Sequence, residues 1–148
     1  MRVVLLNPLW DYGGSIYFGC RDPHLPLELG YARALLAADG HEVTLIDAHA
    51  EGLDLPDMAA RVAARAPELV VITTAPTYLF WRCPPPELRV PKRALAALQG
   101  GAWKTVAVGP HGSTSPVTTQ RKLGVDAVVL GECEEVVRAL AATAPSDW

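Results

Sequence analysis

Short apolar runs alternate along this chain with longer segments in which apolar residues recur every three or four positions. We expect the runs to be strands, because near-continuous Val, Leu and Ile are typical of strands buried on both faces. The spacing between them, such as Leu27, Tyr31 and Leu35, predicts helices. The predicted strands are Arg2–Leu6, Glu42–Asp47, Leu69–Thr74, Lys104–Val108 and Asp126–Leu130.

Proline, glycine and aspartate mark the ends of the predicted helices. Pro26 suits a first helical position, Gly40 suits a helix end, and Asp54 is a candidate N-cap. The expected helices cover about 26–38, 56–66, 91–98, 115–124 and 132–144.

Strands that alternate with helices predict right-handed crossovers and a parallel sheet. The fold class is therefore α/β, a three-layer flavodoxin-like (Rossmann-like) domain with a five-stranded parallel sheet of order 2-1-3-4-5. We expect one domain over residues 1–148, without repeats or internal linkers.

Four connections leave the expected carboxyl edge of the sheet, where ligands collect in such folds. Residues 7–25 and 75–90 are unusually long and rich in aromatic residues, including Tyr78. These aromatic side chains either cover a flat ligand, dock a partner domain, or close the core beneath their own loops.

The other two connections begin at glycine. Gly109, Pro110, His111 and the serines that follow could wrap a polar ligand, or form a plain turn with a serine cap. Residues 131–135 place Glu132 and two further carboxylates at a helix start, where they either contact a ligand or compensate the helix dipole. These carboxylates argue against a phosphate cradle.

Composition narrows the function classes. Among 148 residues the net charge is −3, without the basic clustering of nucleic-acid surfaces, and no apolar run is long enough to span a membrane. We expect a cytoplasmic protein.

The three cysteines lack zinc or iron–sulfur spacing and are interpreted as free thiols. Cys133 lies where a helix N-terminus would lower its pKa, although an incidental thiol is the favoured interpretation.

Several segments, read in order, resemble one family. They are Leu6-Asn7-Pro8, Pro26–Tyr31, Asp39–Val43, Asp47, Pro67–Val70, Thr73-Thr74, Gly109-Pro110-His111, Asp126–Val129 and Gly131–Glu134. This set resembles the N-terminal cobalamin-binding domain of cobalamin-dependent radical S-adenosylmethionine enzymes. Family members often have a second glycine where Pro110 stands, or vary around it, and usually have glycine where Cys133 stands; the segment 74–86 is longer than the common pattern.

The resemblance implies that cobalamin binds base-off, with no histidine in place of the displaced nucleotide base. Gly109, Pro110, His111, Gly131 and Glu132 would line the nucleotide tail. The residues implied near the lower side of the corrin are Asn7, Pro8, Thr73, Thr74 and Tyr78. The implied role is to carry a methyl group or position the cofactor, as methylcobalamin or hydroxocobalamin, for a methyltransferase.

Asp47–Gly52 also matches the pattern D-x-H-x-x-G, which supplies a cobalt-binding histidine, here His49, in another group of cobalamin proteins. That loop follows the first strand in those proteins, whereas here it follows the second. We interpret the match as accidental and expect Asp47 to bond local backbone.

The cysteine motif that would hold a catalytic iron–sulfur cluster is missing from this chain, and no acid–base pair is evident. We expect no activity from the chain alone, and a radical S-adenosylmethionine domain that supplies the cluster and S-adenosylmethionine in cis or in trans. The chain is then either a truncated domain or a stand-alone carrier. Two other interpretations stay open: a flavodoxin-like interaction or regulatory domain without ligand, and a small enzyme using another nucleotide such as flavin.

Overall fold

The structure is a computed structural model that describes residues 1–11, 22–77, 88–144 and 147. Its centre is a five-stranded sheet in which every pairing is parallel and the strand order is β2-β1-β3-β4-β5. This confirms the predicted fold class and order. The strands are β1 Arg2–Asn7, β2 Glu42–Asp47, β3 Leu69–Thr73, β4 Lys104–Val108 and β5 Ala127–Val128.

Seven helices are described around the sheet, within the part of the chain given above: α1 Leu27–Ala38, α2 Ala48–Glu51, α3 Leu55–Ala63, α5 Arg89–Ala97, α6 Pro110–Thr114, α7 Pro116–Leu123 and α8 Glu134–Ala142. The sequence predicts five of them to within a few residues. The short helices α2 and α6 were not predicted, because four or five residues cannot display a helical period.

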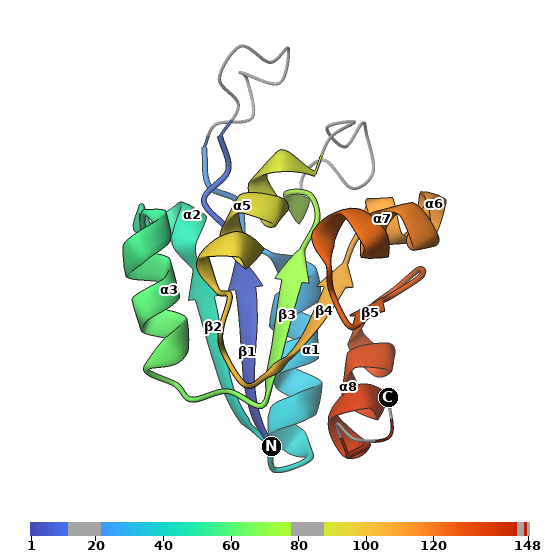
Figure 1. Cartoon of the computed structure of the whole chain (residues 1–148). Coiled ribbons are helices and arrows are strands. Elements are labelled where there is room, and N and C mark those ends of the chain that lie inside the picture. The colour runs from blue at the N-terminus through green and yellow to red at the C-terminus, as the bar shows by residue number, and fades with distance from the viewer. Residues whose placement is uncertain (12–21, 78–87, 145–146, 148) are drawn as a thin grey trace.

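The two faces of the sheet carry separate cores, because neighbouring residues of a strand point to opposite faces. Val4 and Leu6 of β1 belong to the core beneath α3, α5 and α7, whereas Val3 and Leu5 pack with α1 and α8. In Figure 1, α5 crosses in front of the sheet and α1 passes behind it. All strands end at the upper edge in this view, which is the carboxyl edge of the sheet.

Strand β5 is shorter than the expected Asp126–Leu130. Ala127 and Val128 pair with β4, and the Val129 amide still donates to the Ala107 carbonyl at 2.9 Å. The chain then leaves the sheet through Leu130, which is exposed, and Gly131, whose φ is +76°. The positive φ explains why a glycine ends this strand.

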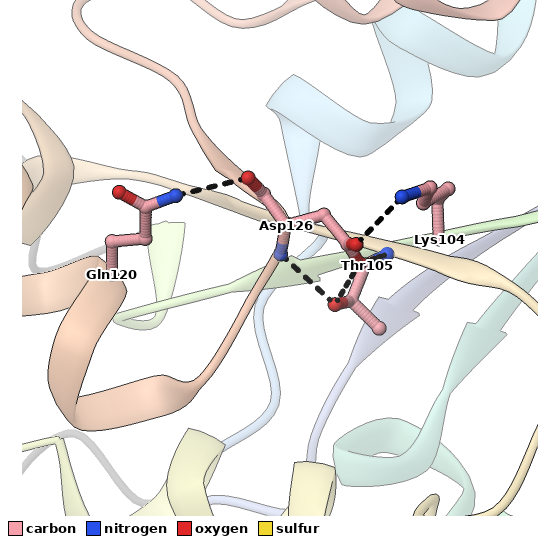
Figure 2. A network of polar contacts seen from close by, with 4 residues as sticks. All are labelled: Lys104, Thr105, Gln120 and Asp126. Carbon is pink, nitrogen blue, oxygen red and sulfur yellow. Dashed lines mark hydrogen bonds and ion pairs between the residues drawn. The ribbon is translucent and has the colours of Figure 1, made fainter. Parts of the chain in front are cut away.

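Asp126 fixes the opposite, amino-terminal end of β4 and β5 (Figure 2). Its carboxylate accepts hydrogen bonds from the Thr105 amide and hydroxyl at 2.8 and 2.9 Å and pairs with Lys104 at 3.0 Å. The Gln120 side chain donates to its carbonyl at 2.9 Å. The edge strand is therefore held by side chains where its own ladder is short.

Asp54 is the N-cap of α3, as predicted, since its carboxylate accepts from the Asp57 amide at 2.9 Å. Ser115 occupies the N-cap position of α7, but its side chain makes no capping hydrogen bond. None of the described helices is long and apolar enough to cross a membrane.

Candidate functional site

The two glycine exits meet at one pocket of about 240 Å³ on the carboxyl edge of the sheet. Four predicted site residues, Gly109, Pro110, Gly131 and Glu132, line it. The remaining lining residues are Glu28, Ser113, Thr114 and Cys133. The structure thus brings together residues from the exits of β4 and β5 and from the start of α1.

Close backbone packing joins these exits. A Cβ on Gly112 would lie 2.5 Å from the Val129 carbonyl oxygen and 2.6 Å from Val128 Cγ1. The Gly131 amide donates to Ser113 Oγ at 2.8 Å. Gly109 has a φ of +115°, a conformation that glycine adopts at little cost. Gly109 is therefore the turn at which β4 ends, and the residues from Pro110 to Thr114 form the helix α6.

His111 lies in α6 and is not among the described residues that line the pocket. Its carbonyl accepts a hydrogen bond from the Thr119 hydroxyl at 2.9 Å, which joins α6 to α7. The structure therefore gives this residue a backbone contact that stabilises the pocket wall.

Glu28 is the acidic residue of the pocket that the sequence analysis did not predict. Its side chain is 9% exposed, Oε2 accepts a hydrogen bond from the Thr77 hydroxyl, and Oε1 has no hydrogen-bond partner among the described residues. Burial raises the pKa of this carboxyl above its usual range, and the charges of Glu134 and Asp47 act in the same direction.

The sequence did hold a signal for the burial of Glu28. It lies four residues before Ala32 and eight before Leu36, both fully buried, so the three share one face of α1. Its position in the first helical turn fits dipole compensation equally well, so this signal alone does not distinguish a buried from an exposed carboxylate.

Cys133 contradicts the expectation of a lowered pKa. It occupies the N-cap position of α8, but its thiol is buried, and burial followed by the charges of Glu134 and Glu28 raises its pKa to about 12. The desolvation of a thiolate outweighs the helix dipole here. The favoured interpretation as an incidental thiol agrees with this burial.

A second polar cluster lies at the ends of β1, β2 and β3. Asn7 Oδ1 accepts a hydrogen bond from Trp10 Nε1 at 2.8 Å, and Asn7 Nδ2 donates to Asp47 Oδ1 at 2.8 Å. The Thr73 hydroxyl lies 3.4 Å from the same Asn7 oxygen. Asn7 and Thr73 are buried, so this cluster fixes the exit of the central strand.

Three other predicted residues follow these strand ends. Pro8 is buried directly after β1. Thr74 links the two clusters, because its amide donates to the Val108 carbonyl at 2.8 Å, and its buried hydroxyl has no partner among the described residues. Tyr78 lies outside the described residues.

The segment Asp47–Gly52 forms the helix α2 and the residue that ends it. Asp47 Oδ1 accepts from the Ala50 amide at 3.0 Å, which confirms that it bonds local backbone. His49 Nδ1 accepts from the Trp10 amide at 3.3 Å. No group of three or more His, Cys, Asp and Glu side chains able to hold a metal ion occurs in the described part of the chain.

Comparison with known proteins identifies the family. The model of the B12 binding domain matches residues 21–141. The chain belongs to the B12 binding domain family. The strand order of this B12 binding domain is the flavodoxin-like order predicted from the sequence. A comparison with curated proteins finds no significant match.

Among solved structures, this B12 binding domain is similar to TsrM, a radical S-adenosylmethionine methyltransferase from Kitasatospora setae. One structure of TsrM contains cobalamin and a 4Fe-4S cluster; it matches with a TM-score of 0.72 and 23% identity over 95% of this chain and 24% of that chain. A second contains tryptophan substrate and the analogue aza-SAM, with the same TM-score and identity and 25% of that chain covered. This chain spans about a quarter of the length of TsrM.

Proposed function

We propose that this domain binds cobalamin at the carboxyl edge of its sheet and positions it for a radical S-adenosylmethionine enzyme, in the first instance a methyltransferase. The observation that carries the proposal is the convergence of the two glycine exits on one pocket in a chain that belongs to the B12 binding domain family. When bound, cobalamin supplies a cobalt centre that can carry a methyl group.

The residues present fit the nucleotide end of such a cofactor. The pocket of about 240 Å³ is smaller than the roughly 300–1,000 Å³ of sites that enclose a whole small molecule. It therefore suits one part of cobalamin, and we assign the nucleotide tail to it. Gly109, Pro110, Gly131 and Glu132 hold the tail through backbone and polar contacts, and His111 supports the wall behind them.

The cluster at the ends of β1 and β3 is assigned to the lower side of the corrin. Asn7, Pro8 and Thr73 are buried there, and the Thr74 hydroxyl is a hydrogen-bonding group that the described residues leave unused. We also assign Tyr78 to this side, as the resemblance implies. The role of these residues is to orient the ring and to keep water from its lower side.

We propose that the base is displaced from cobalt and that no histidine replaces it. His49 is the candidate that a D-x-H-x-x-G pattern would nominate, but it follows β2 instead of β1. The iron–sulfur cluster and S-adenosylmethionine belong in this proposal to a catalytic domain that acts in cis or in trans.

The test is a titration of the chain with hydroxocobalamin and with methylcobalamin, followed by absorbance and calorimetry. We expect saturable binding with a base-off spectrum, and no change of that spectrum in His49→Ala. A spectrum that changes to that of unligated cobalamin in His49→Ala would show that the histidine ligates cobalt. A chain that binds neither form under oxidising or reducing conditions would favour the ligand-free interaction domain.

A matched pair of glycine variants locates the site. Gly131 and Gly124 have φ values of +76° and +68°, and a Cβ at either position meets nothing within 4 Å, so leucine strains both backbones similarly. Gly131 lines the pocket, whereas Gly124 ends α7 at the other end of the sheet. We expect Gly131→Leu to weaken cobalamin binding and Gly124→Leu to leave it unchanged. Equal losses would place the site elsewhere.

A further inference from the structure

The charge of the pocket restricts which part of a nucleotide it can take. Two acidic side chains, Glu28 and Glu132, line it, and no lysine or arginine is among the described lining residues. The carboxylate of Glu134 also lies close enough for its charge to act on Glu28. The charges of Glu132 and Glu134 would repel an anionic phosphate at this position, whereas a neutral or protonated base would not be repelled.

The walls of the pocket suit a flat ring. Gly109 and Gly131 line the pocket without a side chain, and Pro110 adds an apolar ring to the lining. A Cβ on Gly131 would point into open space, so the wall at this residue leaves room for a ligand. These features favour a planar heteroaromatic base over a branched or charged group.

One oxygen of Glu28 is left for such a base. Thr77 occupies Oε2, while Oε1 is buried and has no hydrogen-bond partner among the described residues. A buried carboxyl oxygen without a partner is unfavourable and is usually explained by a group that completes it. Because Glu28 lines the pocket, a ligand in the pocket is the group that can do so.

We propose that the Glu28 carboxyl hydrogen-bonds a ring nitrogen of the cofactor's nucleotide base and so selects for the displaced base. The inference rests on the proposed function. A base nitrogen that has left the metal has a free lone pair, and one proton lies between this nitrogen and Oε1. Either the carboxyl holds the proton and donates it, or the protonated base donates to the carboxylate.

Burial supports the first of these arrangements, because it raises the pKa of Glu28 and keeps the carboxyl protonated closer to neutral pH. The charges of Glu134 on α8 and of Asp47 at the end of β2 act in the same direction, whereas hydrogen bonds from the Thr77 hydroxyl and from the backbone of Glu28 itself oppose them. Glu28 is thus a positioning and selecting group for the base and takes no part in chemistry at the metal.

The experiment compares cobalamin with cobinamide, the same corrin without its nucleotide. Calorimetry would give the affinities of the wild-type chain and of Glu28→Leu, Glu28→Gln and Glu42→Gln; Glu42 is exposed at the start of β2, at the amino end of the sheet. We expect Glu28→Leu to bind cobalamin about tenfold more weakly, as for one lost hydrogen bond to a buried carboxyl. Glu28→Gln, which can still donate, should recover part of this loss.

The affinity for cobinamide should stay unchanged in all variants, and Glu42→Gln should match the wild type with both ligands. Equal losses of cobalamin and cobinamide in Glu28→Leu would overturn the inference but leave the proposed function standing. If the Glu28 variants do not fold, the wild type still decides, because equal affinity for the two ligands would mean that no base is bound in this pocket. Failure of the wild type to bind either ligand would overturn the proposed function itself.

Discussion

Ser113 and Gly131 join the exits of two neighbouring strands: the amide of Gly131 donates a hydrogen bond of 2.8 Å to the hydroxyl oxygen of Ser113. One residue belongs to α6, directly after β4, and the other follows β5, so this bond holds two walls of the pocket at a fixed separation. The sequence separates them by 18 positions, and the parallel sheet brings them together.

The first prediction concerns the hydrogen bond between Gly131 and Ser113. Ser113→Ala removes the acceptor, and because the bond is exposed to solvent we expect a small loss of unfolding free energy, about 0.5–1.5 kcal/mol. Cobalamin affinity should fall as well, since the Gly131 wall is no longer tied. Denaturant unfolding and calorimetry measure the two effects. Ser113→Thr, which keeps a hydroxyl, is the control, and a Ser113→Ala chain with unchanged affinity would contradict this role.

The second prediction concerns the close packing of Gly112 against Val128 and Val129. Alanine at this position places its Cβ 2.5 Å from the Val129 carbonyl oxygen. Because this neighbour is backbone and moves only at a cost in free energy, we expect the free energy of unfolding to fall by about 1–3 kcal/mol. Gly30→Ala is the matched control, because a Cβ there meets nothing within 4 Å in the interior of α1. This control should stabilise the domain by roughly 0.5–1 kcal/mol. Equal effects of the two substitutions, measured by thermal unfolding, would be inconsistent with the packing described.

A third prediction concerns the thiol of Cys133. Burial raises its pKa to about 12, so at pH 8 roughly one molecule in ten thousand carries the reactive thiolate. In a Cys20→Ser/Cys83→Ser variant, Cys133 is the remaining thiol that can react. We expect almost no reaction of this variant with a disulfide reagent until denaturant is added. Glutathione under the same conditions gives the reference rate. Reaction of the native chain at that rate would mean that the thiol is not buried.

The fourth prediction follows the titration of Glu28. Burial raises its folded pKa above the ordinary 4.5, so between these two values the folded chain keeps a proton that the unfolded chain has lost. The free energy of unfolding contributed by Glu28 is therefore present at low pH and is lost as pH rises from about 4.5 through the folded pKa. The groups that face it, the Thr77 hydroxyl and the carboxylates of Glu134 and Asp47, set how far this window extends.

Glu28→Gln cannot titrate and isolates this effect. We expect the wild type to lose stability relative to Glu28→Gln as pH rises from 4 to 8 in denaturant titrations. Carboxylates with lowered pKa values, such as Asp126, act in both chains and cancel in the comparison. Glu42→Gln should follow the wild type, and a difference between wild type and Glu28→Gln that does not change with pH would rule out the buried titration.

The sequence predicted the strand order and four residues of the pocket because these depend on local and periodic signals. Val and Leu runs locate strands, glycine ends them, and parallel connections bring their carboxyl ends together, which places Gly109 near Gly131. Glu28 was missed because its role depends on what packs around it: a carboxylate in a first helical turn has the same sequence signature whether it faces water or a pocket. The raised pKa of Cys133 was not predicted for the same reason, since it depends on burial, which is a tertiary property.

The β4–β5 pairing has a consequence for how the site opens. Two residue pairs hold β5 to β4, whereas six hold β1 to β2, and Gly131, Glu132 and Cys133 all follow β5. Release of this edge strand would dismantle one wall of the pocket while the central strands stay paired, at a smaller free-energy cost than global unfolding. A base seated against that wall would oppose the release. Occupancy of the site and local melting of this sheet edge are then coupled equilibria, so that each shifts the other.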